Sequence, residues 1–242
     1  MKNRLQLFLK DKIDSSWQDL IINALLRLDS SYLEFIITNK EYIPNQNRVF
    51  SAFKTMPKTE VKYILFGQDP YPREQSAIGY AFIDGAVESI FSNGYLSKEV
   101  NRATSLRNFI KMALVAMGRL DSDNTTKDAI ATIRKDDLID SIYELKDNFE
   151  KNGVLLLNTA LIFTDKKSSK YHIKMWQPFI KYLIENIDTS IKLILFGNSA
   201  KDIKSKLNPK QEYIEMEHPY NISFIKSATA QKLFKNMRLL EK

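Results

Sequence analysis

A carboxylate stands where an apolar stretch of this chain ends. The segment KYILFGQDPYP, residues 62–72, passes from an apolar run to Asp69 and then to Tyr71 between two prolines. Such a run is typical of a buried parallel strand, so Asp69 is expected at a strand end. An aspartate before proline is also an ordinary helix cap. Two prolines make the loop rigid, which suits an anion that must be held still for chemistry.

Other side chains of suitable type follow later strand-like segments. Asn158 ends GVLLLNT, residues 153–159, and His218 follows another such segment. Each has an ordinary reading, Asn158 as a turn residue and His218 as a hydrogen-bonded loop histidine. Asn158 also offers a donor and an acceptor that match a base edge. Phe82 is either a core aromatic or a face for a planar ligand. Together with Asp69, they predict a pocket for a flat heterocycle.

The composition argues against a metal site. The chain has no cysteine and two histidines, which leaves little material for thiolate or imidazole ligands. His172 lies in SSKYH, residues 168–172, away from any strand end, and is expected at the surface. We therefore expect no metal and no other cofactor.

These side chains need a sheet to bring them together. Buried strands are predicted at 63–66, 154–158, 191–196 and 212–216, and helices at 16–29, 105–117, 136–151, 175–187, 200–207 and 228–240. Alternating strands and helices indicate one α/β domain, a three-layer α/β/α arrangement with a central four-stranded, mainly parallel sheet. Ligands bind at the carboxyl ends of such strands, so Asp69, Asn158 and His218 are expected to converge there.

Length and charge set further expectations. A chain of 242 residues is at the upper end of a single domain, and its net charge of +7 favours a polyanionic partner such as nucleic acid. No apolar run has the length of a membrane span, and charges at residues 10–12 interrupt any signal-peptide core. We expect a soluble, cytoplasmic monomer. Between residues 84 and 136 the pattern is weaker, with turns at 92–94 and 121–126.

Four segments resemble motifs of the uracil-DNA glycosylases. GQDPY at 67–71 is similar to the water-activating motif of that family, and GYAF follows at 79–82. LLLNT at 155–159 is similar to its base-reading strand, and HP at 218–219 opens its last motif. The resemblance runs from about residue 61 to the C-terminus, with the motifs in family order.

The resemblance implies a role for each residue of the pocket. Gln68 and Asp69 would hold the attacking water, and Asp69 would also balance positive charge on the sugar. His218 would donate a hydrogen bond to the O2 oxygen of the departing base. Tyr71 would press against the C5 edge and exclude the methyl group of thymine, and Phe82 would stack on the ring.

Asn158 would read the edge of uracil, and further residues would contact the DNA. By the same resemblance, two serines would grip flanking phosphates and an aliphatic side chain would fill the gap left in the duplex. The expected DNA-binding residues are Ser105, Asn198, Tyr220, Ile222 and Ser223.

The segments that would contact DNA differ from the family pattern. Pro72 replaces a histidine, NRAT at 101–104 replaces a proline-rich loop, and the family's SPLS reads YNIS at 220–223. A histidine usual in the family is absent near Ser169, and insertions are expected within 84–104 and 118–136. The pocket motifs are thus kept, while the DNA-contacting rim is changed.

The leading hypothesis is a monofunctional glycosylase that excises uracil from DNA for base excision repair. The sequence shows no lysine placed for Schiff-base lyase chemistry. One alternative is a glycosylase for a modified pyrimidine, such as a hypermodified cytosine of phage DNA, acting in anti-phage defence. Another is a non-catalytic DNA-binding or polymerase-associated module on the same fold.

Overall fold

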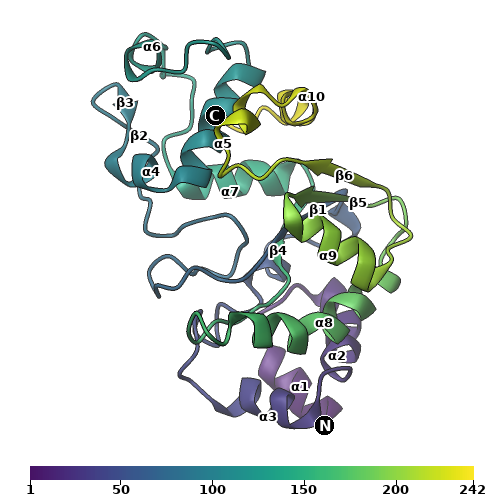
Figure 1. The fold of residues 1–242 in the computed structure, drawn as a ribbon. Coiled ribbons are helices and arrows are strands. Elements are labelled where there is room, and N and C mark those ends of the chain that lie inside the picture. The colour runs from purple at the N-terminus through teal and green to yellow at the C-terminus, as the bar shows by residue number, and fades with distance from the viewer.

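A parallel sheet forms the centre of the molecule (Figure 1). The computed structural model describes residues 1–197 and 203–242 in full and, of residues 198–202, only the backbone. The sheet has the order β4-β1-β5-β6, and each neighbouring pair is parallel. Its strands are β1 (Tyr63–Gly67), β4 (Val154–Asn158), β5 (Lys192–Phe196) and β6 (Tyr213–Met216).

Helices cover both faces of this sheet, as Figure 1 shows, and this confirms the predicted three-layer α/β/α fold. One layer holds α1 (Lys2–Leu9), α2 (Gln18–Leu25), α3 (Ser30–Thr38), α8 (Ser169–Glu185) and α9 (Asn198–Leu207). The other holds α5 (Thr104–Ala116), α7 (Ile142–Lys151) and α10 (Ala228–Met237).

The remaining elements are short. They are the hairpin of β2 (Phe91–Ser92) and β3 (Tyr95–Leu96), the helices α4 (Lys98–Arg102) and α6 (Lys127–Ala131), and the 3-10 turns η1 (Ser15–Trp17), η2 (Ser51–Phe53), η3 (Lys58–Glu60) and η4 (Ile222–Lys226). Residues 84–136 therefore contain a hairpin as well as the expected helices and loops.

The apolar runs of the strands follow from burial on both faces. In β1, Ile64 and Phe66 belong to the core under α2 and α8, while Leu65 belongs to the core under α5, α7 and α10. In β4, Leu155 and Leu157 face the first core and Leu156 faces the second. Successive side chains of a strand point to opposite faces of the sheet. Because both faces are buried, every position requires an apolar residue, and the strands do not alternate between polar and apolar residues.

Several predicted boundaries were wrong. The helix predicted at 136–151 begins at Ile142, because Ser141 and Glu144 form a capping box there. The helix predicted at 16–29 is the turn η1 followed by α2, which ends at Leu25. The helix predicted at 228–240 ends at Met237, where Arg238 takes a left-handed φ of 47°.

The strand β6 is less buried than predicted. It lies at the edge of the sheet, with Tyr213 42% exposed. The helices α1 and α3 were not predicted. His172, expected at the surface, is instead buried with 3% of its area exposed, because α8 begins at Ser169 and carries it into the core.

Candidate active site

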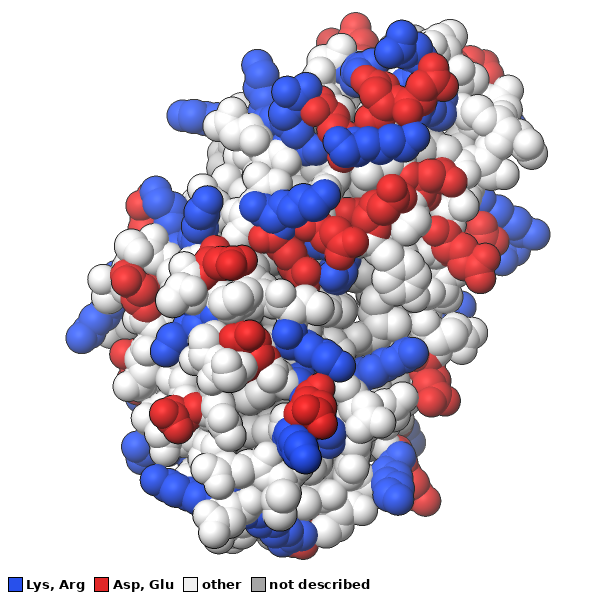
Figure 2. Space-filling view, turned by 180° about the vertical axis from the view of Figure 1, so that it is seen from behind, with Lys and Arg blue, Asp and Glu red and all other residues white. Residues whose placement is uncertain are grey.

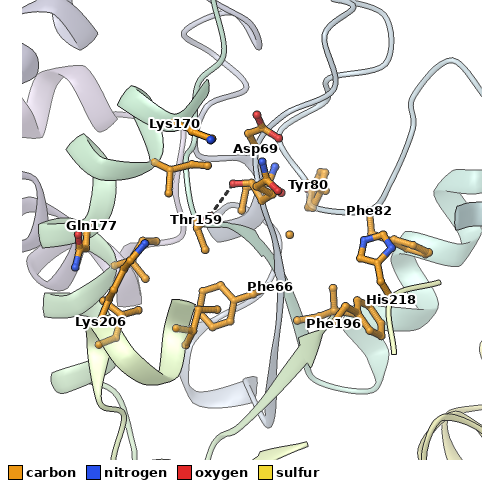
Figure 3. A pocket seen from close by; sticks show the side chains of 18 of the residues that line it. Phe66, Asp69, Tyr80, Phe82, Thr159, Lys170, Gln177, Phe196, Lys206 and His218 are labelled. Atoms are coloured by element: carbon orange, nitrogen blue, oxygen red, sulfur yellow. Dashed lines mark hydrogen bonds between the residues drawn. The ribbon is translucent and has the colours of Figure 1, made fainter. Parts of the chain in front are cut away.

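The carboxyl ends of the strands open into one cavity of about 980 Å³. Figure 3 shows Asp69 and Lys170 on one side of it, Phe82, Phe196 and His218 on another, and Gln177 with Lys206 on a third. The predicted residues that line it are Gln68, Asp69, Tyr71, Phe82, Ser105, Asn158 and His218. The expected convergence of Asp69, Asn158 and His218 is therefore present in the structure.

Backbone bonds fix the end of β1 against the end of β4. Gly67 pairs with Asn158 in the register of the sheet. Beyond the strands, the carbonyl oxygen of Gln68 accepts hydrogen bonds from the Ala160 N–H at 3.0 Å and the Thr159 hydroxyl at 2.7 Å, the second drawn in Figure 3. The segment that carries Asp69 is thus held to the segment that carries Asn158.

Asn158 is buried, with 7% of its area exposed, and lines the cavity. Among the residues that the structure describes, none forms a hydrogen bond with its carboxamide. Neither polar atom of this carboxamide is among the fully buried unpaired side-chain atoms, which fits a side chain that faces the cavity. An amide left open toward a cavity is therefore suited to a ligand with a complementary donor and acceptor.

Asp69 is half-buried at the start of the loop after β1. One of its oxygens, Oδ2, accepts a hydrogen bond from the Ser169 hydroxyl at 2.5 Å. The loop is stiffened by the prolines at 70 and 72. A carboxylate in this setting can hold a water molecule or face a developing positive charge.

Tyr71 and Phe82 form an aromatic wall. The Tyr71 hydroxyl donates to the Phe82 carbonyl at 3.3 Å, and burial raises the pKa of Tyr71 well above its usual value, with a smaller contribution from Asp84. Phe82 has a φ of 69°, a left-handed conformation that is strained for a bulky side chain. Its ring packs on Phe109 with the centroids 4.8 Å apart.

The surroundings of His218 favour one neutral form of its ring. The backbone N–H of Tyr220 donates to Nδ1 at 3.0 Å, so the proton of the neutral imidazole is on Nε2. Burial lowers the pKa of His218 from its ordinary value. The ring lies edge-on to Phe196, with the centroids 6.3 Å apart. His218 can therefore donate a hydrogen bond from Nε2.

The residues predicted to contact DNA are only partly in the cavity. Ser105 lines it, whereas Tyr220 and Ile222 lie on the loop after His218 and are each 66% exposed. The Ser223 hydroxyl donates to Glu217 at 2.6 Å. Asn198 lies outside the residues whose side chains the structure describes.

Several lining residues were not predicted from the sequence. Thr159 and Phe196 follow or end strands that were predicted, so their position at the sheet edge was an available signal. A second group comes from one side of α8, at helical spacing, and from α9. This group is Lys170, Ile173, Lys174, Gln177, Ile180, Ile203, Lys206 and Leu207.

The face of the molecule in Figure 2 carries both basic and acidic side chains, although the net charge of the chain is +7. On this face, the acidic side chains form a band across the molecule.

In the part of the chain that is described, no group of three or more His, Cys, Asp or Glu residues is arranged to hold a metal ion. Within the same residues, no helix is long and apolar enough to cross a membrane.

Known proteins are similar to this chain in sequence and in fold. The family model described as uracil DNA glycosylase superfamily matches residues 53–239. A crystal structure of the wild-type UNG of Nitratifractor salsuginis has a TM-score of 0.95 and 49% identity, covering 99% of this chain and 98% of that one.

Relatives that are less similar in sequence are also named uracil-DNA glycosylases. The uracil-DNA glycosylase of Campylobacter lari is 27% identical over 219 residues, which cover 87% of this chain and 82% of that protein. A uracil-DNA glycosylase of Borreliella burgdorferi is 27% identical over 222 residues, covering 87% of this chain and 85% of the other. The predicted base-pocket residues all lie within the region that the family model matches.

Proposed function

Because this chain belongs to the uracil DNA glycosylase superfamily, we propose that it is a monofunctional DNA glycosylase that removes uracil from DNA. It hydrolyses the N-glycosidic bond of a flipped-out uracil and leaves an abasic site, the first step of base excision repair. It acts on DNA as a monomer, in the cytoplasm, and without a metal ion.

One observation carries this proposal. Asp69, Asn158 and His218 follow or end different strands, and they line the same cavity although they are far apart in the sequence. A base inside a duplex stack cannot reach such a cavity, so the nucleotide must be extruded at a cost of a few kcal/mol. An anion, an amide and a neutral imidazole around one extruded base supply the groups that the reaction needs.

The chemistry begins with the bond between C1′ of the sugar and N1 of the base. As this bond breaks, its electron pair leaves with the base and positive charge develops on the sugar. Asp69 opposes that charge, and Gln68 and Asp69 hold a water molecule. The water oxygen forms the new bond to C1′ while its proton leaves through the Asp69 carboxylate.

His218 stabilises the departing base. Its Nε2–H donates to the O2 oxygen, on which negative charge accumulates. The lowered pKa of His218 and the hydrogen bond that its Nδ1 accepts from the Tyr220 N–H both support a neutral ring in this role. A preorganised donor of this kind lowers a barrier by about 3 kcal/mol.

Recognition of uracil is assigned to Asn158, Tyr71 and Phe82. The carboxamide of Asn158 pairs with the edge of uracil, and cytosine presents its donor and acceptor in the opposite order, which leaves buried groups unpaired. Phe82 stacks on the ring. The hydroxyl of Tyr71 is tied to the Phe82 backbone, which supports a fixed wall at C5 and favours uracil over pyrimidines with bulky C5 substituents.

The DNA on either side of the base is held by the residues of the rim. Ile222 is the wedge that fills the gap in the duplex, and its 66% exposure supports that role. Tyr220, on the same loop, is equally exposed. Ser105, Ser223 and Asn198 complete the proposed DNA-binding set.

A panel of single-base substrates tests the function. The purified protein is incubated with matched oligonucleotide duplexes that contain one uracil, thymine, cytosine or hypermodified cytosine, and free base and abasic sites are measured. We expect release of uracil alone. Preferential release of the hypermodified base would identify that base, and not uracil, as the substrate. DNA binding without release of any base would support the non-catalytic alternative.

A further inference from the structure

The carboxylate of Asp69 is held by a residue that lies far from it in sequence. The Ser169 hydroxyl donates to Asp69 Oδ2 at 2.5 Å, across a separation of 100 residues. Among the described residues, no other hydrogen bond to the Asp69 side chain is present. One carboxylate oxygen is therefore engaged by protein, and Oδ1 remains open toward the cavity that Asp69 lines.

Ser169 is itself fixed by its place in the chain. It is the first residue of α8. The turn before it is closed by Asp165, whose carboxylate accepts hydrogen bonds from the backbone N–H groups of Lys167 at 2.8 Å and Ser168 at 3.1 Å. The Ser168 hydroxyl adds a third bond to Asp165 at 2.8 Å. The helix therefore begins at a well-defined point.

The first turn of α8 is also anchored to the N-terminal helices. His172 is buried, and its Nδ1 lies 2.7 Å from the Tyr32 hydroxyl, while its Nε2 lies 2.9 Å from the Thr164 hydroxyl. Tyr32 belongs to α3, whose side chains pack in the same core as α8. Burial lowers the pKa of His172 against the opposing effects of Asp165 and Asp69, so the ring is neutral, with one nitrogen as donor and the other as acceptor.

From these contacts we infer that Ser169 is a positioning residue for Asp69, and that the His172–Tyr32 pair holds Ser169 in place. The inference rests on the proposed function, since it assigns Asp69 to the reaction. The Ser169 bond restrains rotation of the carboxylate, keeps Oδ2 on the side of α8 and presents Oδ1 to the water and the sugar. A displacement of about 1 Å in a reacting group can lower a rate about 100-fold, so such a restraint matters.

Single-turnover kinetics with saturating enzyme test this inference. Uracil release and the Kd for uracil-containing duplex are compared for the wild type, Ser169→Ala and Ser169→Thr. We expect the alanine variant to release uracil roughly 10- to 100-fold more slowly with little change in Kd. The threonine variant, which keeps the hydroxyl, should recover most of the rate.

Two further variants separate positioning from a general structural effect. Ser31→Ala removes a surface hydroxyl that donates to Asp29 at the same distance of 2.5 Å, and it should leave rate and Kd unchanged. Tyr32→Phe removes the hydroxyl that contacts His172 and should slow release by a smaller factor than Ser169→Ala.

The outcomes also distinguish this inference from the proposed function. If the wild type releases uracil and Ser169→Ala does so at the same rate, the inference is overturned while the function stands. An equal loss in rate and DNA affinity would also overturn it. If the wild type releases no uracil, the proposed function itself fails.

Discussion

Gly67 leaves the space that the side chain of Asn158 occupies. The two residues are partners in the register of β1 and β4. A Cβ atom on Gly67 would overlap Oδ1 of Asn158 and would stand 2.9 Å from Cβ of Ala81. Atoms do not approach so closely, so the glycine is required for the carboxamide to point into the cavity.

The first prediction concerns this glycine. Gly67→Ala should displace the Asn158 carboxamide and weaken its pairing with the base. Loss of a pairing worth about 1–3 kcal/mol in the transition state corresponds to roughly 10- to 100-fold in kcat/KM for uracil release. Initial rates on a uracil-containing duplex measure it. Gly94→Ala is the control for a loss of stability away from the cavity, because an added Cβ there meets nothing within 4 Å but the φ of 80° strains an alanine, and it should leave the rate unchanged. Equal activity in both variants would show that Asn158 does not need this space.

A second prediction concerns base choice at Asn158. Asn158→Asp replaces the amide donor by an acceptor, which no longer matches uracil but accepts from the amino group of cytosine. Uracil release should fall at least about 100-fold, since unpaired buried groups cost several kcal/mol, and slow release of cytosine should appear. The variant and Asn158→Ala are assayed on both substrates. If Asn158→Ala releases cytosine equally well, the amide does not set the choice of base.

A third prediction concerns pH. Because burial lowers the pKa of His218, the neutral ring persists below the ordinary histidine value of about 6.5. The neutral ring, with its proton on Nε2, therefore supports the full rate at pH values above the ordinary pKa. This contribution to the rate is lost only when the pH falls through the lowered pKa of His218. Protonation would also break the bond that Nδ1 accepts from the Tyr220 N–H. A pH profile of single-turnover rates should therefore fall below about 6.5 in the wild type, and His218→Ala should lack that limb. A limb centred above the ordinary value would contradict this role.

A fourth prediction concerns Lys170, which lines the cavity beside Asp69 (Figure 3). An exposed lysine at this rim is placed to meet a phosphate of the bound strand. Lys170→Gln should weaken binding to DNA of any sequence. A plot of the logarithm of the DNA-binding constant against the logarithm of the salt concentration should become less steep by roughly 0.7–0.9. Lys62→Gln is the control, because Lys62 directly precedes β1 and so lies at the amino ends of the strands, opposite the cavity. An unchanged slope for Lys170→Gln would exclude this contact.

The strands were predictable because each is a short apolar run that ends in polar residues. Burial on both faces makes this pattern strong, and the ends of such strands must meet at one edge of the sheet. Asp69, Asn158 and His218 could be placed together for that reason alone. The strand β6 is the exception. Both β4 and β6 lie at edges of the sheet, but β4 is buried throughout, whereas β6 carries Glu215 among its apolar residues and leaves Tyr213 42% exposed.

The start of α8 shows what could not be predicted. Proline is tolerated in the first turn of a helix, so Pro178 favours a helix that begins near residue 175. The structure places Pro178 inside a longer helix that begins at Ser169. Tertiary contacts of His172 with Tyr32 and Thr164 stabilise the additional turns, and no local signal reveals such contacts. The missed helix start hid both the burial of His172 and the contact between Ser169 and Asp69.

In the proposed reaction, hydrolysis of the glycosidic bond of uracil depends on the Asp69 carboxylate. The most direct measurement is single-turnover release of uracil by the wild type and by Asp69→Asn, with the Kd for the same duplex determined in parallel. We predict that the wild type releases uracil and leaves an abasic site, and that Asp69→Asn binds the duplex with similar affinity while its rate falls by orders of magnitude. Uracil release by Asp69→Asn at the wild-type rate would contradict a role of this carboxylate in the reaction.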